Sequence, residues 1–149
     1  MGTAITQNDA GIQQVYDLER AMHALPSEDK VDLVTTHVLH AGLYHRTVHI
    51  PAGVLVAGAL VKIDTTVIVH GDVSVFIDGE PVLLQGHNVL PAYANRKQAA
   101  LAHTDTFYTM SFATDVKTVE DAEEQFTNEV HALGSRRDAS VNHTMITGG

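Results

Sequence analysis

The sequence predicts a mainly β protein, an antiparallel barrel or sandwich preceded by one helix and followed by another. Residues 54–112 consist of short apolar and β-branched runs separated by breakers such as Gly71-Asp72 and Asp78-Gly79-Glu80-Pro81. Such runs between turn signals are typical of strands, and Asp-Gly supplies the positive φ angles of hairpin turns. No part of this stretch has the longer periodicity that a helix needs.

Eight strands are expected between the two helices. Their ranges are 43–50, 54–63 (a long buried strand), 65–70, 73–77, 82–84, 89–90, 98–102 and 106–112. The first helix is expected to begin at Asn8 or Asp9, either of which can cap it, and to end at Pro26. Residues 27–39 combine charged and β-branched side chains, and the sequence leaves their structure open.

The last helix is predicted from Thr118, which with Asp121 approximates a capping box. Its apolar stripe runs from Val119 to Leu133, and Gly134 is a suitable residue to follow its end. The predicted organisation is an N-terminal helical or extended arm (1–42), a β-barrel (43–113), a C-terminal helix (114–134) and a polar tail (135–149).

The composition argues against several classes of protein, among them nucleic-acid binding and membrane-spanning proteins. The 149 residues fit one domain, and 18 acidic against 9 basic residues give a formal charge of −9. A net anion is a poor match for nucleic acid, whose binding depends on Lys and Arg neutralising phosphates. The longest apolar run, 54–61, is too short to span a bilayer. Since there are no cysteines, disulfides and thiolate metal sites are excluded.

The run from Ile50 to Ala92 resembles a cupin (RmlC-type) barrel, whose landmark positions are occupied here by Gly71, Gly86 and Pro91. Three shorter motifs are similar to small cupin-like proteins encoded by tailed bacteriophages. These motifs are Gly42-Leu43-Tyr44, Ile50-Pro51-Ala52-Gly53 and Ala102-His103-Thr104-Asp105-Thr106. The resemblance covers residues 42–126 and implies a cupin-type jelly roll.

The chain departs from the cupin pattern at the metal ligands. The resemblance puts Asp64 at the glutamate position and Arg96 near the second-motif histidine. The remaining two histidine positions fall among Gly58, Leu60 and Lys62, and residues 50–69 contain no histidine. A single carboxylate is not a transition-metal site, so we expect no metal and no cofactor in the barrel.

Two clusters remain as candidate sites. Lys62, Asp64 and Arg96 are predicted to approach one another inside the barrel or at its mouth, where they could bind a small anion; the alternative is a solvated mouth. The second cluster is His37, His40, His45 and His49, which lie close enough in sequence that a metal site stays open. Solvent-facing or hydrogen-bonded histidines are the alternative.

Two functions follow as expectations. Loss of the cupin ligands favours a non-catalytic, metal-free building block or virion accessory protein that forms a homo-oligomer and contacts other phage structural proteins. Its tail is expected to dock on a partner through Val141, Met145 and Ile146. The phage resemblance implies the host cytoplasm during assembly and the virion, with no nucleic-acid or membrane partner. The alternative is a cupin enzyme, or a small-molecule binding protein, that uses Lys62, Asp64 and Arg96.

Overall fold

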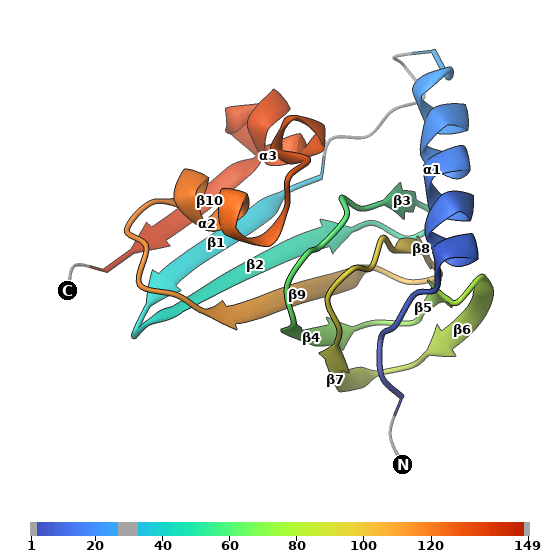
Figure 1. The fold of residues 1–149 in the computed structure, drawn as a ribbon, viewed down its shortest axis with the longest axis horizontal. Helices are drawn as coiled ribbons and strands as arrows, with labels where there is room; N and C mark the ends of the chain where they lie inside the picture. Colours follow the sequence, from blue (N-terminus) through green and yellow to red (C-terminus); the bar gives the residue numbers. More distant parts are fainter. Residues whose placement is uncertain (1–2, 27–32, 148–149) are drawn as a thin grey trace.

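The computed structural model describes residues 3–26 and 33–147 and shows two β-sheets packed face to face (Figure 1). The large sheet has six strands in the order β10-β1-β2-β9-β4-β7, and the small sheet has four in the order β3-β8-β5-β6. The strands of the large sheet are β10 (Asn142–Ile146), β1 (Thr35–His40), β2 (Leu43–Ile50), β9 (Thr106–Ala113), β4 (Thr65–His70) and β7 (His87–Ala92). Those of the small sheet are β3 (Leu55–Ala57), β8 (Ala99–Ala102), β5 (Val73–Ile77) and β6 (Glu80–Leu84).

The strand order is that of a jelly roll. Counting from β2, the eight strands to β9 are divided between the sheets as β2-β9-β4-β7 and β3-β8-β5-β6. All neighbours within these two sets are antiparallel. This arrangement of two interlocked Greek keys is the cupin-type fold, so the predicted fold class is confirmed.

The predicted Asp78-Gly79 turn closes the hairpin of β5 and β6, whereas Gly71-Asp72 joins β4 of the large sheet to β5 of the small sheet and closes no hairpin. Asp78 and Gly79 both have positive φ (52° and 82°), as a two-residue hairpin loop with the strand twist requires. Three strands, Leu43–Ile50, Thr65–His70 and Val73–Ile77, have the predicted bounds. Local breakers and alternation therefore decided the strand positions in this half of the chain.

Two apolar clusters form the core. One fills the space between the sheets around Val67, Val69, Val73 and Val75, all fully buried. The other lies where Tyr44, Met110 and Phe112 of the large sheet meet the helix α2 (Val119–Phe126). The C-terminal segment thus extends the core beyond the barrel.

Helix α1 (Asp9–His23) lies along the outer side of the small sheet (Figure 1). The Asn8 side chain accepts a hydrogen bond from Gly11 N, which confirms the predicted cap. Residues 27–32, part of the stretch left open by the sequence, lie outside the described residues. No helix in the described ranges is long and apolar enough to cross a membrane.

The predicted long strand at 54–63 is wrong, because only Leu55–Ala57 is paired as β3. Beyond it the backbone leaves the sheet, and its hydrogen bonds go to the C-terminal segment. Leu60 N donates to Glu129 Oε1 and Lys62 N to Phe126 O. Long-range contacts with the C-terminal segment thus replace the expected ladder.

The C-terminal helix is also shorter than predicted. It ends at Phe126, because Thr127 is extended and donates its hydroxyl hydrogen to Leu60 O. Two short 3-10 turns, η2 (Val130–Ala132) and η3 (Ala139–Val141), flank a one-turn helix, α3 (Gly134–Arg137). Gly134 therefore begins a helix where the sequence predicted it to follow one. The tail then forms β10, which pairs in parallel with β1, so neither the arm nor the tail is separate from the sheet.

Candidate functional site

Arg96 is the one member of the predicted Lys62, Asp64 and Arg96 set that is buried, at 2% exposed. Asp64 is exposed and accepts a hydrogen bond from Ala94 N at 2.7 Å. Lys62 is exposed, and its Nζ donates to Asn128 Oδ1 at 2.6 Å. Arg96 donates to Ile63 O, beside Asp64, so these two positions are neighbours, whereas Lys62 is engaged with the C-terminal segment.

The guanidinium of Arg96 has only neutral acceptors among the described residues. It donates to Thr65 Oγ1 at 2.7 Å, to Tyr93 O at 2.9 Å and to Ile63 O at 3.3 Å. Burial lowers the pKa of Arg96, and Tyr108 and Asp64 offset part of this effect. A buried cation without a paired carboxylate favours an anion beside it.

Two further polar side chains share the barrel interior with Arg96. The first is Gln98. Side chains alternate along extended backbone, and Ala100 packs in the core, so Gln98 points to the same inner side as Ala100 and Arg96. Both amide atoms of Gln98 are buried without a hydrogen-bond partner in the described structure. Tyr108 lies on β9, where burial raises its pKa to about 12 and nearby Arg96 partly opposes the shift. No sequence motif singles out Gln98 or Tyr108.

The most extensive polar network lies under the C-terminal segment. Glu123 of α2, 1% exposed, accepts from Arg46 at 2.8 Å, from Arg136 at 2.6 Å and from Ser135 at 2.5 Å. Burial alone would raise the pKa of Glu123, but the hydrogen bonds from Arg136, Ser135 and Arg46 lower it. The burial of Glu123 could not be predicted from the sequence, because a helical stripe cannot reveal an arginine on a distant strand.

His37 joins this network from β1. Asn142 Nδ2 donates to Ser135 O, so Asn142 Oδ1 faces His37 Nε2 at 2.9 Å and accepts its hydrogen. His37 Nδ1 then accepts from the Tyr44 hydroxyl at 2.7 Å. Burial lowers the pKa of His37, so the neutral imidazole is the stable form.

Another buried cation, Lys97, joins α1 to the rest of the molecule. Lys97 is fully buried, with its Nζ 3.1 Å from Glu19 and 3.2 Å from Glu129. The same Nζ lies 4.4 Å from the centroid of the Tyr16 ring, whose hydroxyl donates to Glu129. These contacts position α1 on the sheet, and sequence alone does not predict them.

The four histidines left open as a metal set do not converge. His37 points into the network described above, whereas His40, His45 and His49 lie on the opposite face of the sheet. Among residues 3–26 and 33–147, no group of three or more His, Asp or Glu side chains could hold a metal ion.

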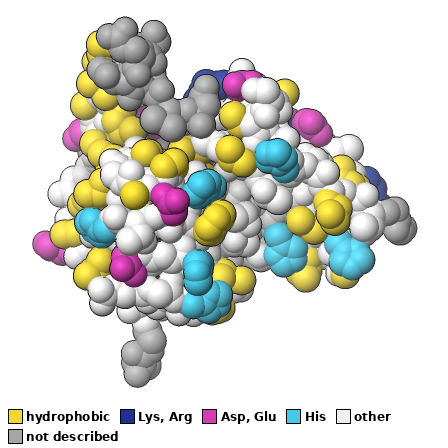
Figure 2. All heavy atoms as spheres, turned by 180° about the vertical axis from the view of Figure 1, so that it is seen from behind, with side chains coloured by type: hydrophobic (Ala, Val, Ile, Leu, Met, Phe, Trp, Pro, Cys, Tyr) yellow, Lys and Arg dark blue, Asp and Glu magenta, His cyan; other side chains and the backbone are white. Residues whose placement is uncertain are grey.

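The outer face of the large sheet has an unusual composition (Figure 2). Strand register places 19 side chains on it, none of them Lys, Arg, Asp or Glu, and six of the ten histidines of the chain are among them. They are Thr36, Val38, His40, Leu43, His45, Thr47, His49, Thr66, Ile68, His70, His87, Val89, Pro91, Phe107, Thr109, Ser111, Ala113, His143 and Met145.

Several of these side chains form hydrogen bonds or ring contacts with side chains of the neighbouring strand. The Thr47 and Thr109 hydroxyls are 2.7 Å apart, and His45 Nδ1 is 2.7 Å from Ser111 Oγ. His49 stacks on Phe107 with ring centroids 4.7 Å apart. The result is an ordered face that carries hydroxyl, imidazole and apolar groups.

Of the predicted assembly residues, Met145 lies on this face, and Val141 and Ile146 lie beside it. Met145 and Ile146 are 63% and 49% exposed on β10, at one edge of the large sheet, and Val141 is half-buried in η3. Ile146 also lines a hollow of about 370 Å³ between the β1–β2 turn and residues 114–117. Their role in assembly stays a prediction.

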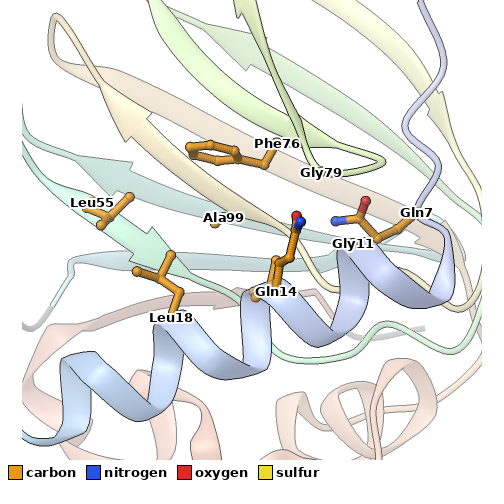
Figure 3. A pocket seen from close by; sticks show the side chains of 9 residues that line it. Gln7, Gly11, Gln14, Leu18, Leu55, Phe76, Gly79 and Ala99 are labelled. Atoms are coloured by element: carbon orange, nitrogen blue, oxygen red, sulfur yellow. The ribbon is translucent and has the colours of Figure 1, made fainter.

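A separate groove of about 270 Å³ lies between α1 and the outer side of the small sheet (Figure 3). Leu18 of the helix faces Leu55 and Phe76, with Ala99 between them. None of the predicted site residues lines it.

No family model and no curated protein matches the sequence. Similar solved structures include KdgF from a Halomonas species (18% identity, TM-score 0.49, covering 63% of this chain and 88% of that one). A cupin superfamily protein from Desulfitobacterium hafniense has 15% identity and a TM-score of 0.47, over 61% of this chain and 95% of that one. An RmlC-like cupin from Methanocaldococcus jannaschii has 14% identity and a TM-score of 0.46, over 60% of this chain and 87% of that one.

At these identities the likeness concerns the fold alone, and the assignment to the cupin-type jelly roll stands on the strand order of this chain. The bacteriophage origin implied by the sequence motifs finds no support among these structures and stays a prediction.

Proposed function

We propose that this protein is a non-catalytic building block, without metal in its barrel, of a homo-oligomeric assembly in which two copies meet through the outer faces of their large sheets. The observation that carries this proposal is the absence of Lys, Arg, Asp and Glu among the 19 strand side chains of that face. The charge of −9 resides elsewhere, so two copies can approach here with least repulsion.

The chemistry of the face favours a second copy as the partner. Hydroxyl groups and neutral imidazoles can each donate and accept a hydrogen bond, so two identical faces can bond to one another. A two-fold interface needs this self-complementarity. Exposed apolar side chains, among them Val89, Phe107 and Met145 at 59%, 45% and 63%, supply area whose burial favours association.

The motif resemblance to phage-encoded proteins extends the proposal to a virion or its assembly in the host cytoplasm, with other phage structural proteins as neighbours. Val141, Met145 and Ile146 would then extend the contact surface at the β10 edge. No nucleic-acid or membrane partner is included, in keeping with the acidic composition.

A matched pair of substitutions tests the interface. Val89 (59% exposed) lies on the outer face of the large sheet and Leu83 (55% exposed) on the outer side of the small sheet. Light scattering at high micromolar concentration should give the mass of two chains for the wild type and for Leu83→Lys, and the mass of one chain for Val89→Lys. A monomeric wild type, or equal effects of the two substitutions, would contradict the interface.

A second candidate function rests on the barrel interior. The unpaired cation of Arg96 and the two orphaned amide atoms of Gln98 are suited to a small anion that also accepts a hydrogen bond from an amide. Calorimetry with phosphate and acetate tests this candidate. Binding that is lost in Gln98→Met, a variant that keeps side-chain volume without hydrogen-bonding atoms, would favour it; the absence of binding would remove it.

A further inference from the structure

We infer that His70 and His87 form a two-imidazole chelate for a divalent transition metal ion such as zinc, on the outside of the barrel. The two residues are directly opposite each other on adjacent antiparallel strands, β4 and β7. Both are exposed, and their ring centroids are 5.7 Å apart with an interplanar angle of 58°. Both residues belong to the outer face of the large sheet, so in the proposed assembly this site lies at the interface, where the second copy can supply further ligands.

The separation fits a shared metal ion. Two imidazoles bound to one tetrahedral zinc ion through nitrogens at about 2.0–2.1 Å have ring centroids roughly 5 Å apart. Small rotations of two exposed side chains cover the difference from 5.7 Å, and no backbone movement is needed.

The backbone beneath the pair is held in place. Gly71 N donates to Gly86 O at 2.8 Å, directly after one histidine and before the other. Gly71 has φ of 134°, and a Cβ there would lie 2.6 Å from Thr106 Oγ1, so only glycine fits this position. The Asp72 carboxylate accepts from Gly86 N at 3.2 Å. Metal binding therefore requires little further ordering of the backbone.

The two rings are also available, unlike other imidazoles of the same face. His40 is bonded to Thr147, His45 to Ser111, and His49 is stacked on Phe107. Within the described residues, His70 and His87 have no hydrogen-bond or ion-pair partner and contact only each other as rings.

Imidazole nitrogens suit zinc, copper and nickel, whereas magnesium and calcium require oxygen ligands. Two protein ligands leave the coordination sphere incomplete, and the described part of this chain offers no third His, Asp or Glu. The remaining positions fall to water or to a side chain of a second copy. This site is separate from the barrel interior, where Arg96 is buried.

Titration calorimetry of the untagged protein with zinc chloride, near neutral pH, tests the site. One zinc ion per chain should bind, and either His70→Gln or His87→Gln should weaken binding at least tenfold. His143→Gln is the matched control, because it removes an exposed imidazole from another edge of the same face, and it should leave binding unchanged. Magnesium chloride should give no heat of binding.

The inference is overturned if the wild type binds no zinc, if either variant of the pair binds like the wild type, or if the control loses as much affinity as they do. Circular dichroism should show all three variants folded, since the substitutions are on the surface. Zinc titration of Val89→Lys, the variant expected to be monomeric, then identifies the other ligands: wild-type affinity assigns them to water, and weakened binding assigns them to a second copy.

Discussion

Glu123 shows how a single residue depends on distant parts of the chain. Its carboxylate joins α2 to Arg46 of β2 and to Arg136 of α3, and it is almost completely buried. Removal of a buried charge leaves its partner desolvated and uncompensated, which is more costly than the loss of an exposed ion pair. The free energy of unfolding should therefore respond strongly to this one position.

We expect Glu123→Gln to lower the free energy of unfolding by ~3–5 kcal/mol, because Arg46 then lacks the only carboxylate that pairs with it among the described residues. Urea denaturation followed by circular dichroism measures the change. The exposed neighbour Glu124 is the control, and Glu124→Gln should alter stability by less than about 0.5 kcal/mol. Equal effects of the two substitutions would show that the network contributes little.

Lys62 should behave in the opposite way, since its side chain is exposed and is bonded only to the Asn128 amide among the described residues. Lys62→Met is expected to change the unfolding free energy by less than about 0.5 kcal/mol. A loss of about 1 kcal/mol or more in thermal or urea unfolding would instead indicate that Lys62 takes part in a buried pair with Asp64.

At the scale of elements, α1 is attached to the small sheet by a buried cation. Lys97 lies between Glu19 of the helix and Glu129 of the C-terminal segment, with the Tyr16 ring over its ammonium group. Burial and the hydrogen bond to Glu129 raise the pKa of Tyr16 to about 12, the hydrogen bond being the larger cause. Three segments distant in sequence thus meet at one nitrogen.

Lys97→Met should loosen the helix first. Loss of the ammonium leaves the partly buried carboxylates of Glu19 and Glu129 close together without a cation, at an expected cost of about 1–3 kcal/mol. Amide hydrogen exchange should accelerate in α1 more than in β4 or β9. Arg20→Met, which removes an exposed pair with Asp17, is the control and should leave exchange unchanged.

At the scale of the whole molecule, stability should depend on pH through His37 and Glu123. The folded-state pKa of His37 lies below its ordinary value of 6.5, and that of Glu123 below 4.5. In each case the unfolded chain binds the proton more readily, so stability is fully present above the ordinary value and declines as the pH falls.

We therefore expect the free energy of unfolding to decrease as the pH drops below about 6.5 and to decrease further below about 4.5. Urea denaturation across this range measures it. His37→Phe should flatten the profile between these two values, whatever its own stability at neutral pH. A profile that stays equally steep would show that other histidines produce the acid sensitivity.

Much of the barrel could be predicted because its determinants are local. Alternating β-branched residues and the Asp78-Gly79 turn indicate strands and a hairpin without reference to the rest of the chain. The prediction failed at residues 58–63 and after Phe126, where an apolar run or a helical stripe satisfied the local pattern equally well. There, hydrogen bonds between the two segments decided the backbone path.

The candidate sites were less accessible from the sequence. Arg96 was predicted as an interior cation and is buried, whereas Lys62 is held elsewhere. The orphaned amide of Gln98 and the opposed pair His70 and His87 could not be predicted, since each depends on which strands become neighbours.

The sequence by itself determined the class of fold, the acidic charge and the absence of histidine from residues 50–69, because these follow from composition and local order. Only the tertiary structure decided which charges are buried and which histidines share a face. A side chain's surroundings depend on the register between strands distant in sequence, and a shift of one residue would move each of them to the opposite face.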